Sequence, residues 1–245
     1  GLILFVGATG AGKSTTQAAM IGYRNRHAND HILTIEDPVE FVHQHDRCLI
    51  TQREVGSDTL SFDDGLKSAL RQAPDVILIG EIRSEETMEF ALSFAETGHL
   101  CMATLHANNA NQAIERILHL VPPSKHRLLM YDLAFNLKAI VAQQLVPTLD
   151  GTGRRAAFEV MLNSPLISDI LRKGEVHRLK ETISRSRELG MTTFDQSLLE
   201  LYKQGVIGFD EALAFADSSN EMRVMIKLAA GGKFDSGMMD NITVS

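Results

Sequence analysis

The residues best suited to chemistry stand near the start of the chain, in a glycine-rich segment that ends in lysine and serine. Residues 7–14 fit the pattern G-x-x-x-x-G-K-[ST], which forms a loop around the phosphates of a nucleotide. Backbone N–H groups of such a loop turn towards one anion, Lys13 would reach the β- and γ-phosphates, and the Ser14 hydroxyl would hold Mg²⁺. The predicted nucleotide-binding residues are Gly7, Ala8, Thr9, Gly10, Ala11, Gly12, Lys13, Ser14 and Thr15.

Hydrolysis also needs a carboxylate for Mg²⁺, one to activate water, and a group that senses the γ-phosphate. Glu81 follows the apolar run 76–79, where a Walker B acid is expected, and Gly80 stands where an aspartate is usual. Glu36, or Glu40 on the same acidic turn, could position water, and His106 could donate a hydrogen bond to the γ-phosphate. We predict Glu36, Glu81 and His106 as catalytic residues, and Ser14 and Glu81 as magnesium ligands, the latter directly or through water.

Each of these side chains has a plainer interpretation. An acid at the end of a strand is commonly a solvated loop residue, and an isolated histidine is more often a hydrogen-bonded structural residue. Arg53, Arg71 and Arg83 lie near the motifs and could reach a phosphate on the same or a neighbouring subunit, although surface solvation explains any one of them equally well. The phosphate loop favours the catalytic interpretation of Glu81 and His106.

The segments that would position these residues alternate between apolar runs and amphipathic patterns. This alternation predicts an α/β fold with a mainly parallel sheet, and the carboxyl ends of its strands would carry the site. The predicted strands cover 2–6, 31–35, 48–55, 75–81 and 99–105, with a hairpin of 144–146 and 156–160 at the edge of the sheet. The predicted helices follow the loop at 15–21 and cover 62–72, the segment between Ser84 and Gly98, 111–120 and 125–142.

The pattern becomes helical throughout after residue 164. Helices are predicted over 165–173, 176–188, 194–204, 209–216 and 220–228. The predicted organisation is an ATPase core over 1–163, a C-terminal helical subdomain over 164–228, and a flexible tail over 229–245 that lacks any period.

Composition excludes several classes of protein. The chain has 245 residues, of which 44% are hydrophobic, so it can bury a core. A net charge of −7 gives no general attraction to nucleic acid or to an anionic membrane surface. Cys48 and Cys101 are too few for a four-cysteine zinc site or a disulfide framework, and they favour a reducing compartment. The sequence begins at Gly1 beside a core strand, so we expect a fragment of a longer protein.

The motifs together resemble those of a known family. The phosphate loop, the acidic box 34–41, the Walker B strand 75–83 and the histidine box 97–106 follow each other in the order seen in the secretion ATPase superfamily. Within it the chain is similar to the type IV pilus twitching-motility retraction ATPases of the PilT/PilU family, and most to the PilU branch. The segments that carry this closer similarity are 51–56, 70–83 and 189–195.

The resemblance implies a RecA-like P-loop core that hydrolyses ATP with Mg²⁺ in a ring-shaped homohexamer. It implies that Lys13 and Ser14 bind phosphate and Mg²⁺, while Glu36 is the general base, Glu81 the Walker B acid and His106 the γ-phosphate sensor. It places the protein in the cytoplasm, peripheral at the inner membrane, where it would act on the inner-membrane platform protein of the pilus.

Two departures from the family pattern qualify this expectation. We expect the family's PAS-like N-terminal domain to belong to a part of the protein that this fragment lacks. The helical motif of the retraction family stands at 165–172 with its asparagine and arginine changed. The second departure fits an accessory motor that works with a principal PilT-type retraction ATPase. An alternative function is a nucleotide-binding adaptor with little turnover of its own. A nucleic-acid motor is disfavoured by the acidic charge balance.

Overall fold

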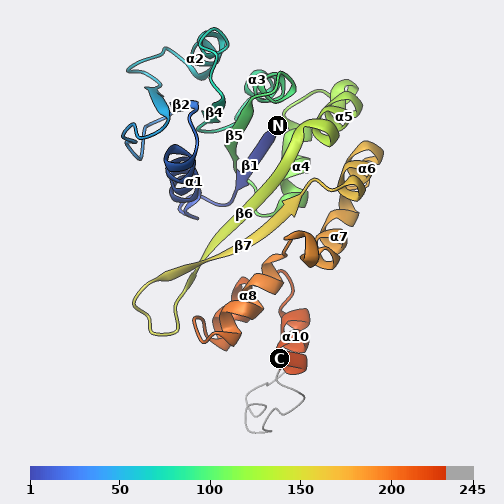
Figure 1. Cartoon of the computed structure of the whole chain (residues 1–245). Coiled ribbons are helices and arrows are strands. Elements are labelled where there is room, and N and C mark those ends of the chain that lie inside the picture. Colours follow the sequence, from blue (N-terminus) through green and yellow to red (C-terminus); the bar gives the residue numbers. More distant parts are fainter. Residues whose placement is uncertain (230–245) are drawn as a thin grey trace. The chain divides into compact units, whose positions relative to one another are not determined.

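A computed structural model of the chain, which describes residues 1–229, contains one seven-stranded sheet with helices on both faces (Figure 1). The strand order is β3-β2-β4-β5-β1-β6-β7, and the pairs from β3 through β6 are parallel. The predicted α/β class is confirmed. The strands are β1 Leu2–Val6, β2 His31–Glu36, β3 Leu49–Glu54, β4 Val76–Ile79, β5 Leu100–Leu105, β6 Leu137–Pro147 and β7 Arg154–Leu162.

The helices begin where the sequence offers a side chain that caps them. Ser61, Ser84, Asn109 and Ser164 each accept a hydrogen bond from the backbone N–H three residues on, which satisfies a donor that the helix itself leaves unpaired. The helices are α1 Lys13–His27, α2 Phe62–Ala69, α3 Glu85–Glu96, α4 Ala110–His119, α5 His126–Asn136, α6 Pro165–Lys173, α7 Leu179–Arg185, α8 Phe194–Lys203, α9 Phe209–Phe215 and α10 Ser219–Ala229.

Apolar side chains on both faces of the central strands form the core. All four residues of β4 are buried, as expected of a parallel strand that helices cover on both sides. On one face α1 contributes Ile21 to a cluster with Phe5 of β1 and Met102 of β5. Figure 1 shows α1 on this face and α3, α4 and α5 on the other. The central strands are thus fixed from both sides, and their carboxyl ends are held in register.

The predicted helix over 125–142 is wrong in its second half. The helix α5 ends at Asn136, and Leu137 begins β6, which pairs with β1 from Leu2↔Leu137 to Val6↔Ala142. The run 137–142 is apolar enough to suit either a buried helix or a buried strand. Pairing with β1 decides between them, and that contact is invisible to a local pattern. The consequence is that β1 has a parallel neighbour on each side.

A second correction concerns the predicted helix over 176–188. Residues 176–178 and 187–189 form single 3-10 turns, and only Leu179–Arg185 is α-helical. The α-helix ends because Ser186 leaves the helical region, with φ −112° and ψ 36°. The predicted edge hairpin is confirmed, since β7 lies beside β6 at the end of the strand order.

The chain divides into two compact units. Unit 1 comprises residues 1–145 and 158–193, and the described part of unit 2 comprises residues 146–157 and 194–229. This division differs from the predicted boundary between 163 and 164, because α6 and α7 belong to unit 1 and the hairpin turn belongs to unit 2. Ala229, where the predicted tail begins, is the last residue of α10, and residues 230–245 of that tail lie outside the described residues.

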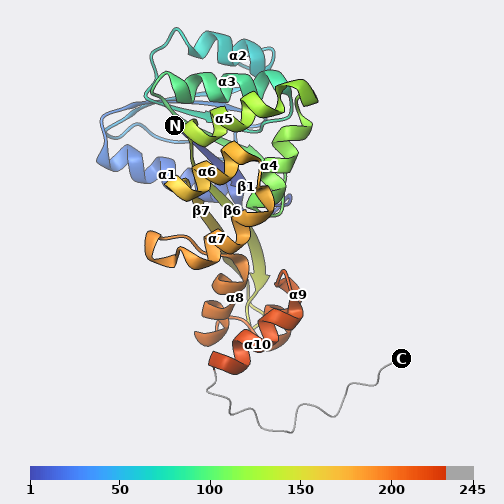
Figure 2. The same ribbon diagram turned by 90° about the vertical axis from the view of Figure 1, so that its right-hand side faces the viewer.

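Unit 2 is held together by backbone and side-chain contacts between distant segments. The N–H of Leu149 in the hairpin turn donates to the carbonyl of Val206 (2.9 Å), and the N–H of Asp217 donates to the carboxylate of Asp195 (2.9 Å). Figure 2 shows α8, α9 and α10 packed together. Among the helices of residues 1–229, none is long and apolar enough to cross a membrane.

Candidate nucleotide site

The glycine-rich loop joins β1 to α1 at the carboxyl edge of the sheet. Gly10 and Gly12 adopt left-handed backbone conformations, with φ 78° and 87°, which residues with a side chain rarely take up. Gly12 is the N-cap of α1, so the loop opens directly onto the positive end of that helix. The fold therefore supplies the strand, turn and helix that a phosphate loop requires.

Lys13 is bound to the loop that precedes it. Its ammonium donates hydrogen bonds to the carbonyls of Gly7 (2.8 Å) and Ala8 (3.1 Å). Partial burial lowers the pKa of Lys13, and the negative charges of Glu81 and Glu40 offset part of that effect. The cation is thus desolvated and faces two carboxylates of the predicted site.

Glu81 lies between two cationic or potentially cationic side chains. One oxygen is 2.9 Å from Nε2 of His106 and the other is 2.6 Å from Nε of Arg83. Arg83 also comes within 3.8 Å of Asp37 on the acidic turn. The Glu81 side chain is 17% exposed, whereas those of His106 and Arg83 are 47% and 61% exposed. The carboxylate is therefore the fixed centre of this group, and its partners reach it from solvent.

Hydrogen bonds to both neighbouring strands hold the backbone around Glu81. The N–H of Gly80 donates to the carbonyl of Ile35 (2.8 Å), and the hydroxyl of Thr104 donates to the carbonyl of Gly80. The N–H of Ile82 donates to the carbonyl of Thr104 (2.9 Å). The last residues of β2 and β5 thus fix the position of Glu81. Thr104 is a contributor that the sequence prediction left out, although it belongs to the histidine box.

The closeness of the β2 backbone explains why position 80 is a glycine. A Cβ atom there would lie 3.2 Å from Cα of Glu36 and 3.2 Å from the carbonyl oxygen of Ile35. Both are backbone atoms of β2, which cannot move aside as a flexible side chain can. Any side chain at this position, including that of an aspartate, would therefore press against the backbone of β2.

Glu36 ends β2 and is half-buried. Its carboxylate accepts hydrogen bonds from the Thr34 hydroxyl (2.6 Å) and from Nε2 of Gln52 (3.3 Å). The carboxylate of Glu36 also interacts electrostatically with His43. Burial lowers the pKa of His43, and the negative charge of Glu36 offsets part of that shift. Glu40, the other candidate on the acidic turn, is exposed. The predicted roles of Glu36 and Glu40 in catalysis stay predictions.

The fold brings the phosphate loop, Glu36, Glu81 and His106 to one edge of the sheet. Of the three arginines, Arg83 joins Glu81, Arg53 donates to the Ser68 hydroxyl (3.3 Å), and Arg71 is exposed. Within residues 1–229, no group of three or more His, Cys, Asp or Glu side chains gathers as a metal site.

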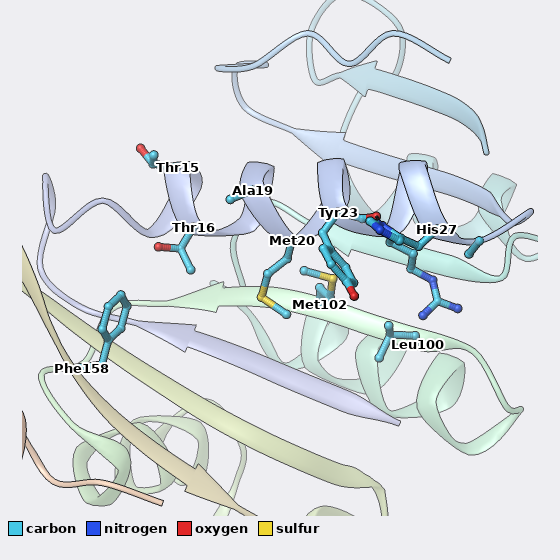
Figure 3. Close-up of a pocket in the computed structure, with 11 residues that line it drawn as sticks. Thr15, Thr16, Ala19, Met20, Tyr23, His27, Leu100, Met102 and Phe158 are labelled. Atoms are coloured by element: carbon cyan, nitrogen blue, oxygen red, sulfur yellow. Dashed lines mark hydrogen bonds between the residues drawn. The ribbon is translucent and has the colours of Figure 1, made fainter. Parts of the chain in front are cut away.

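A pocket of about 730 Å³ runs along α1, next to the loop (Figure 3). Thr15 and Thr16 line one end, and the rest is lined mainly by apolar or aromatic side chains such as Met20, Tyr23 and Phe158, together with Arg24 and His27. Figure 3 shows Met20 and Tyr23 pointing from α1 towards β5. The ionisable side chains of the predicted site are not part of this lining, so the pocket and the carboxylates are separate features.

Comparison with known proteins supplies the family. A family model described as type II/IV secretion system protein matches residues 1–212. The chain belongs to this family. Similar members are the type IV pilus ATPase PilU of Pseudomonas aeruginosa, 62% identical over 99% of the chain, and the pilus retraction ATPase PilT of the same organism, 44% identical over 86%. The predicted resemblance to the PilT/PilU branch is confirmed.

Solved structures of secretion family members support the same conclusion. The crystal structure of the pilus retraction motor PilT with bound ADP matches 92% of the chain and 64% of that protein, with a TM-score of 0.85 and 42% identity. The predicted RecA-like fold is confirmed by this likeness. The chain spans 63% of the PilU relative and 61% of the PilT relative, so it corresponds to a part of each.

Proposed function

We propose that this chain is the ATP-hydrolysing core of a motor that retracts type IV pili. The observation that carries the proposal is the juxtaposition of a complete phosphate loop with Glu81, whose oxygens are 2.6 Å and 2.9 Å from Arg83 and His106. A nucleotide-binding module without turnover has no need of a partly buried acid next to the loop. The retraction role is supported by the likeness of the chain to the pilus retraction ATPase PilT.

In this proposal each side chain acts on a bound polyphosphate. Lys13 neutralises the β- and γ-phosphates, and its partial desolvation strengthens that attraction. Glu36 orients the attacking water, and His106 reports on the γ-phosphate through its link with Glu81. Ser14 and Glu81 would hold Mg²⁺, which neutralises charge that develops on the phosphate oxygens. Glu81 fits this role because its carboxylate is only 17% exposed and interacts electrostatically with Lys13 of the loop.

We further propose that the full-length protein forms a homohexamer at the cytoplasmic face of the inner membrane. There it would act on the pilus platform protein, as an accessory to a principal PilT-type retraction ATPase. The family match and the PilU relative support this assignment. The acidic composition, with a net charge of −7, supports a protein partner rather than a nucleic acid.

A second candidate function is an adaptor that binds nucleotide but turns it over slowly. The observation in its favour is that Glu81 stands alone, with Gly80 beside it, and has both oxygens engaged by Arg83 and His106. A carboxylate so engaged must exchange a partner before it can support hydrolysis. The two candidates therefore differ in turnover, while both bind nucleotide.

The deciding experiment measures Mg-ATP hydrolysis by the full-length protein, alone and with a PilT-type partner. Glu81→Gln and Glu36→Gln should each lower kcat by at least about a hundredfold while ADP binding persists. Glu40→Gln is the matched control on the same turn and should leave kcat within about twofold. Binding without turnover in both settings would establish the adaptor instead. A loss of activity in Glu40→Gln but not in Glu36→Gln would exchange their roles.

A further inference from the structure

Gln143 is a buried polar side chain that the sequence motifs do not include. It is 5% exposed and lies on β6, the parallel neighbour of β1. The register pairs Val6 with Ala142, which places Gln143 level with the first glycine of the phosphate loop. A long amide side chain at this depth needs polar partners, because burying it without them is unfavourable.

The first turn of α1 supplies a polar partner, and the loop lies close to this residue. The hydroxyl of Thr16, on the first turn of α1, donates to Oε1 of Gln143 (2.6 Å). A Cβ atom added to Gly7 would lie 2.5 Å from the backbone oxygen of Gln143, and one added to Gly12 would lie 2.7 Å from its Nε2. The start of the loop, its end and the first turn of α1 therefore all adjoin a single residue of β6.

The contact with Gln143 is a second reason why two positions of the loop require glycine. Gly12 has φ 87°, which already favours glycine, and Gly7 with φ 155° has no room for a side chain beside Gln143. The direction of the backbone N–H groups in the loop depends on these conformations. A contact that fixes Gly7, Gly12 and Thr16 together therefore fixes the donors that would face a phosphate.

We propose that Gln143 is a positioning residue of the nucleotide site, which acts through Thr16 and the loop backbone. The inference rests on the proposed nucleotide-binding function. Gln143 itself makes no contact with phosphate in this proposal. It holds the loop in the conformation that binds the polyphosphate, and Thr16 completes the contact from the side of α1.

The test measures binding of a fluorescent ADP analogue to the full-length protein. Gln143→Leu removes both polar atoms at similar volume, and Thr16→Val removes the hydroxyl at similar shape. Each should weaken binding of the analogue by about three- to tenfold. Because both remove the same hydrogen bond, the double variant should bind no more weakly than the single variant with the lower affinity. Thr16→Ser, which restores a hydroxyl, should recover affinity to within about twofold, a rescue that lost packing alone would not give. KM should rise with little change in kcat.

Lys13→Ala separates the failure of this inference from that of the proposed function. If the wild-type protein binds the analogue and Lys13→Ala does not, the site is established. Wild-type affinity in both Gln143→Leu and Thr16→Val would then overturn the positioning role alone, as would effects that add in the double variant. If the wild-type protein does not bind the analogue, both proposals are overturned. Should Gln143→Leu fail to fold, Thr16→Val tests the same hydrogen bond.

Discussion

Replacing Gly80 by alanine should destabilise the protein, although the same change usually does little outside a helix. The new Cβ would meet two backbone atoms of β2, Cα of Glu36 and the oxygen of Ile35, each at 3.2 Å. Gly80 cannot retreat, because its N–H is bound to Ile35 and its carbonyl to Thr104. Overpacking of this kind costs about 1–3 kcal/mol. Alanine also restricts the unfolded chain more than glycine does, which offsets about 0.4–1 kcal/mol of the lost stability.

The expected net loss is therefore about 1–2 kcal/mol of the free energy of unfolding. Thermal unfolding followed by circular dichroism should show it as a fall in Tm of roughly 2–8 °C. Gly80→Asp should lose more, because its larger side chain would press against the same backbone atoms. Restoring the usual Walker B aspartate should thus lower stability and leave hydrolysis no faster.

Gly22→Ala provides a matched control in the same unit. Gly22 lies inside α1, and a Cβ there would lie 3.5 Å from Nη1 of Arg26, the flexible end of a side chain. This variant should gain about 0.5–1 kcal/mol, because alanine favours a helix interior more than glycine does. A Gly80→Ala protein as stable as the wild type, beside a stabilised Gly22→Ala protein, would refute the steric argument.

Three further predictions rest on other parts of unit 1. A bound polyphosphate should raise the lowered pKa of Lys13, so ADP binding should take up protons at alkaline pH values below 10.5. The binding enthalpy measured by calorimetry should then depend on the ionisation enthalpy of the buffer. Equal enthalpies in different buffers would contradict this prediction. Burial raises the pKa of Cys101 to about 12. Above pH 9 the folded thiol therefore keeps its proton while the unfolded thiol releases it, so this group lowers the free energy of unfolding as the pH rises from 9 to about 12. Alkylation of Cys101, followed by mass spectrometry, should accordingly need unfolding, and rapid reaction of the native protein would disprove it. The Asn163 amide donates to the carbonyls of Ala134 (2.9 Å) and Leu137 (2.8 Å), so Asn163→Ala should lose about 1–3 kcal/mol in urea unfolding, and an unchanged midpoint would show that these bonds contribute nothing.

Sequence alone predicts those parts of the fold that local pattern determines. The run before Gly7, the run 76–79 and the capping residue Ser84 each specify their element without reference to the rest of the chain. The segment 137–142 does not, since its state depends on pairing with β1. The placement of residues 164–193 within unit 1 is likewise a matter of tertiary contact, because a helical pattern does not show what the helix packs against.

The candidate site, like the fold, has one part that the sequence predicts and another that it does not. Parallel strands end at one edge, so acids placed after β2 and β4 could be expected near the loop that follows β1. The partners of those acids could not be predicted, because side-chain contacts depend on register and rotamer. Thr34 on Glu36 and Arg83 on Glu81 are examples close in sequence. The same holds for the contact of Thr16 with Gln143, which joins residues 127 positions apart.

The position of β1 between two parallel partners has a consequence for the dynamics of the loop. Its amides are bonded into the middle of the sheet, through β5 on one side and β6 on the other, whereas Ala8, Thr9 and Gly10 are exposed. Amide hydrogen exchange should therefore change steeply over a few residues, from slow exchange limited by unfolding of the sheet to fast exchange by local fluctuation. The exposed residues 8–10 can adjust around a ligand, while the strand and the two ends of the loop beside Gln143 keep their place.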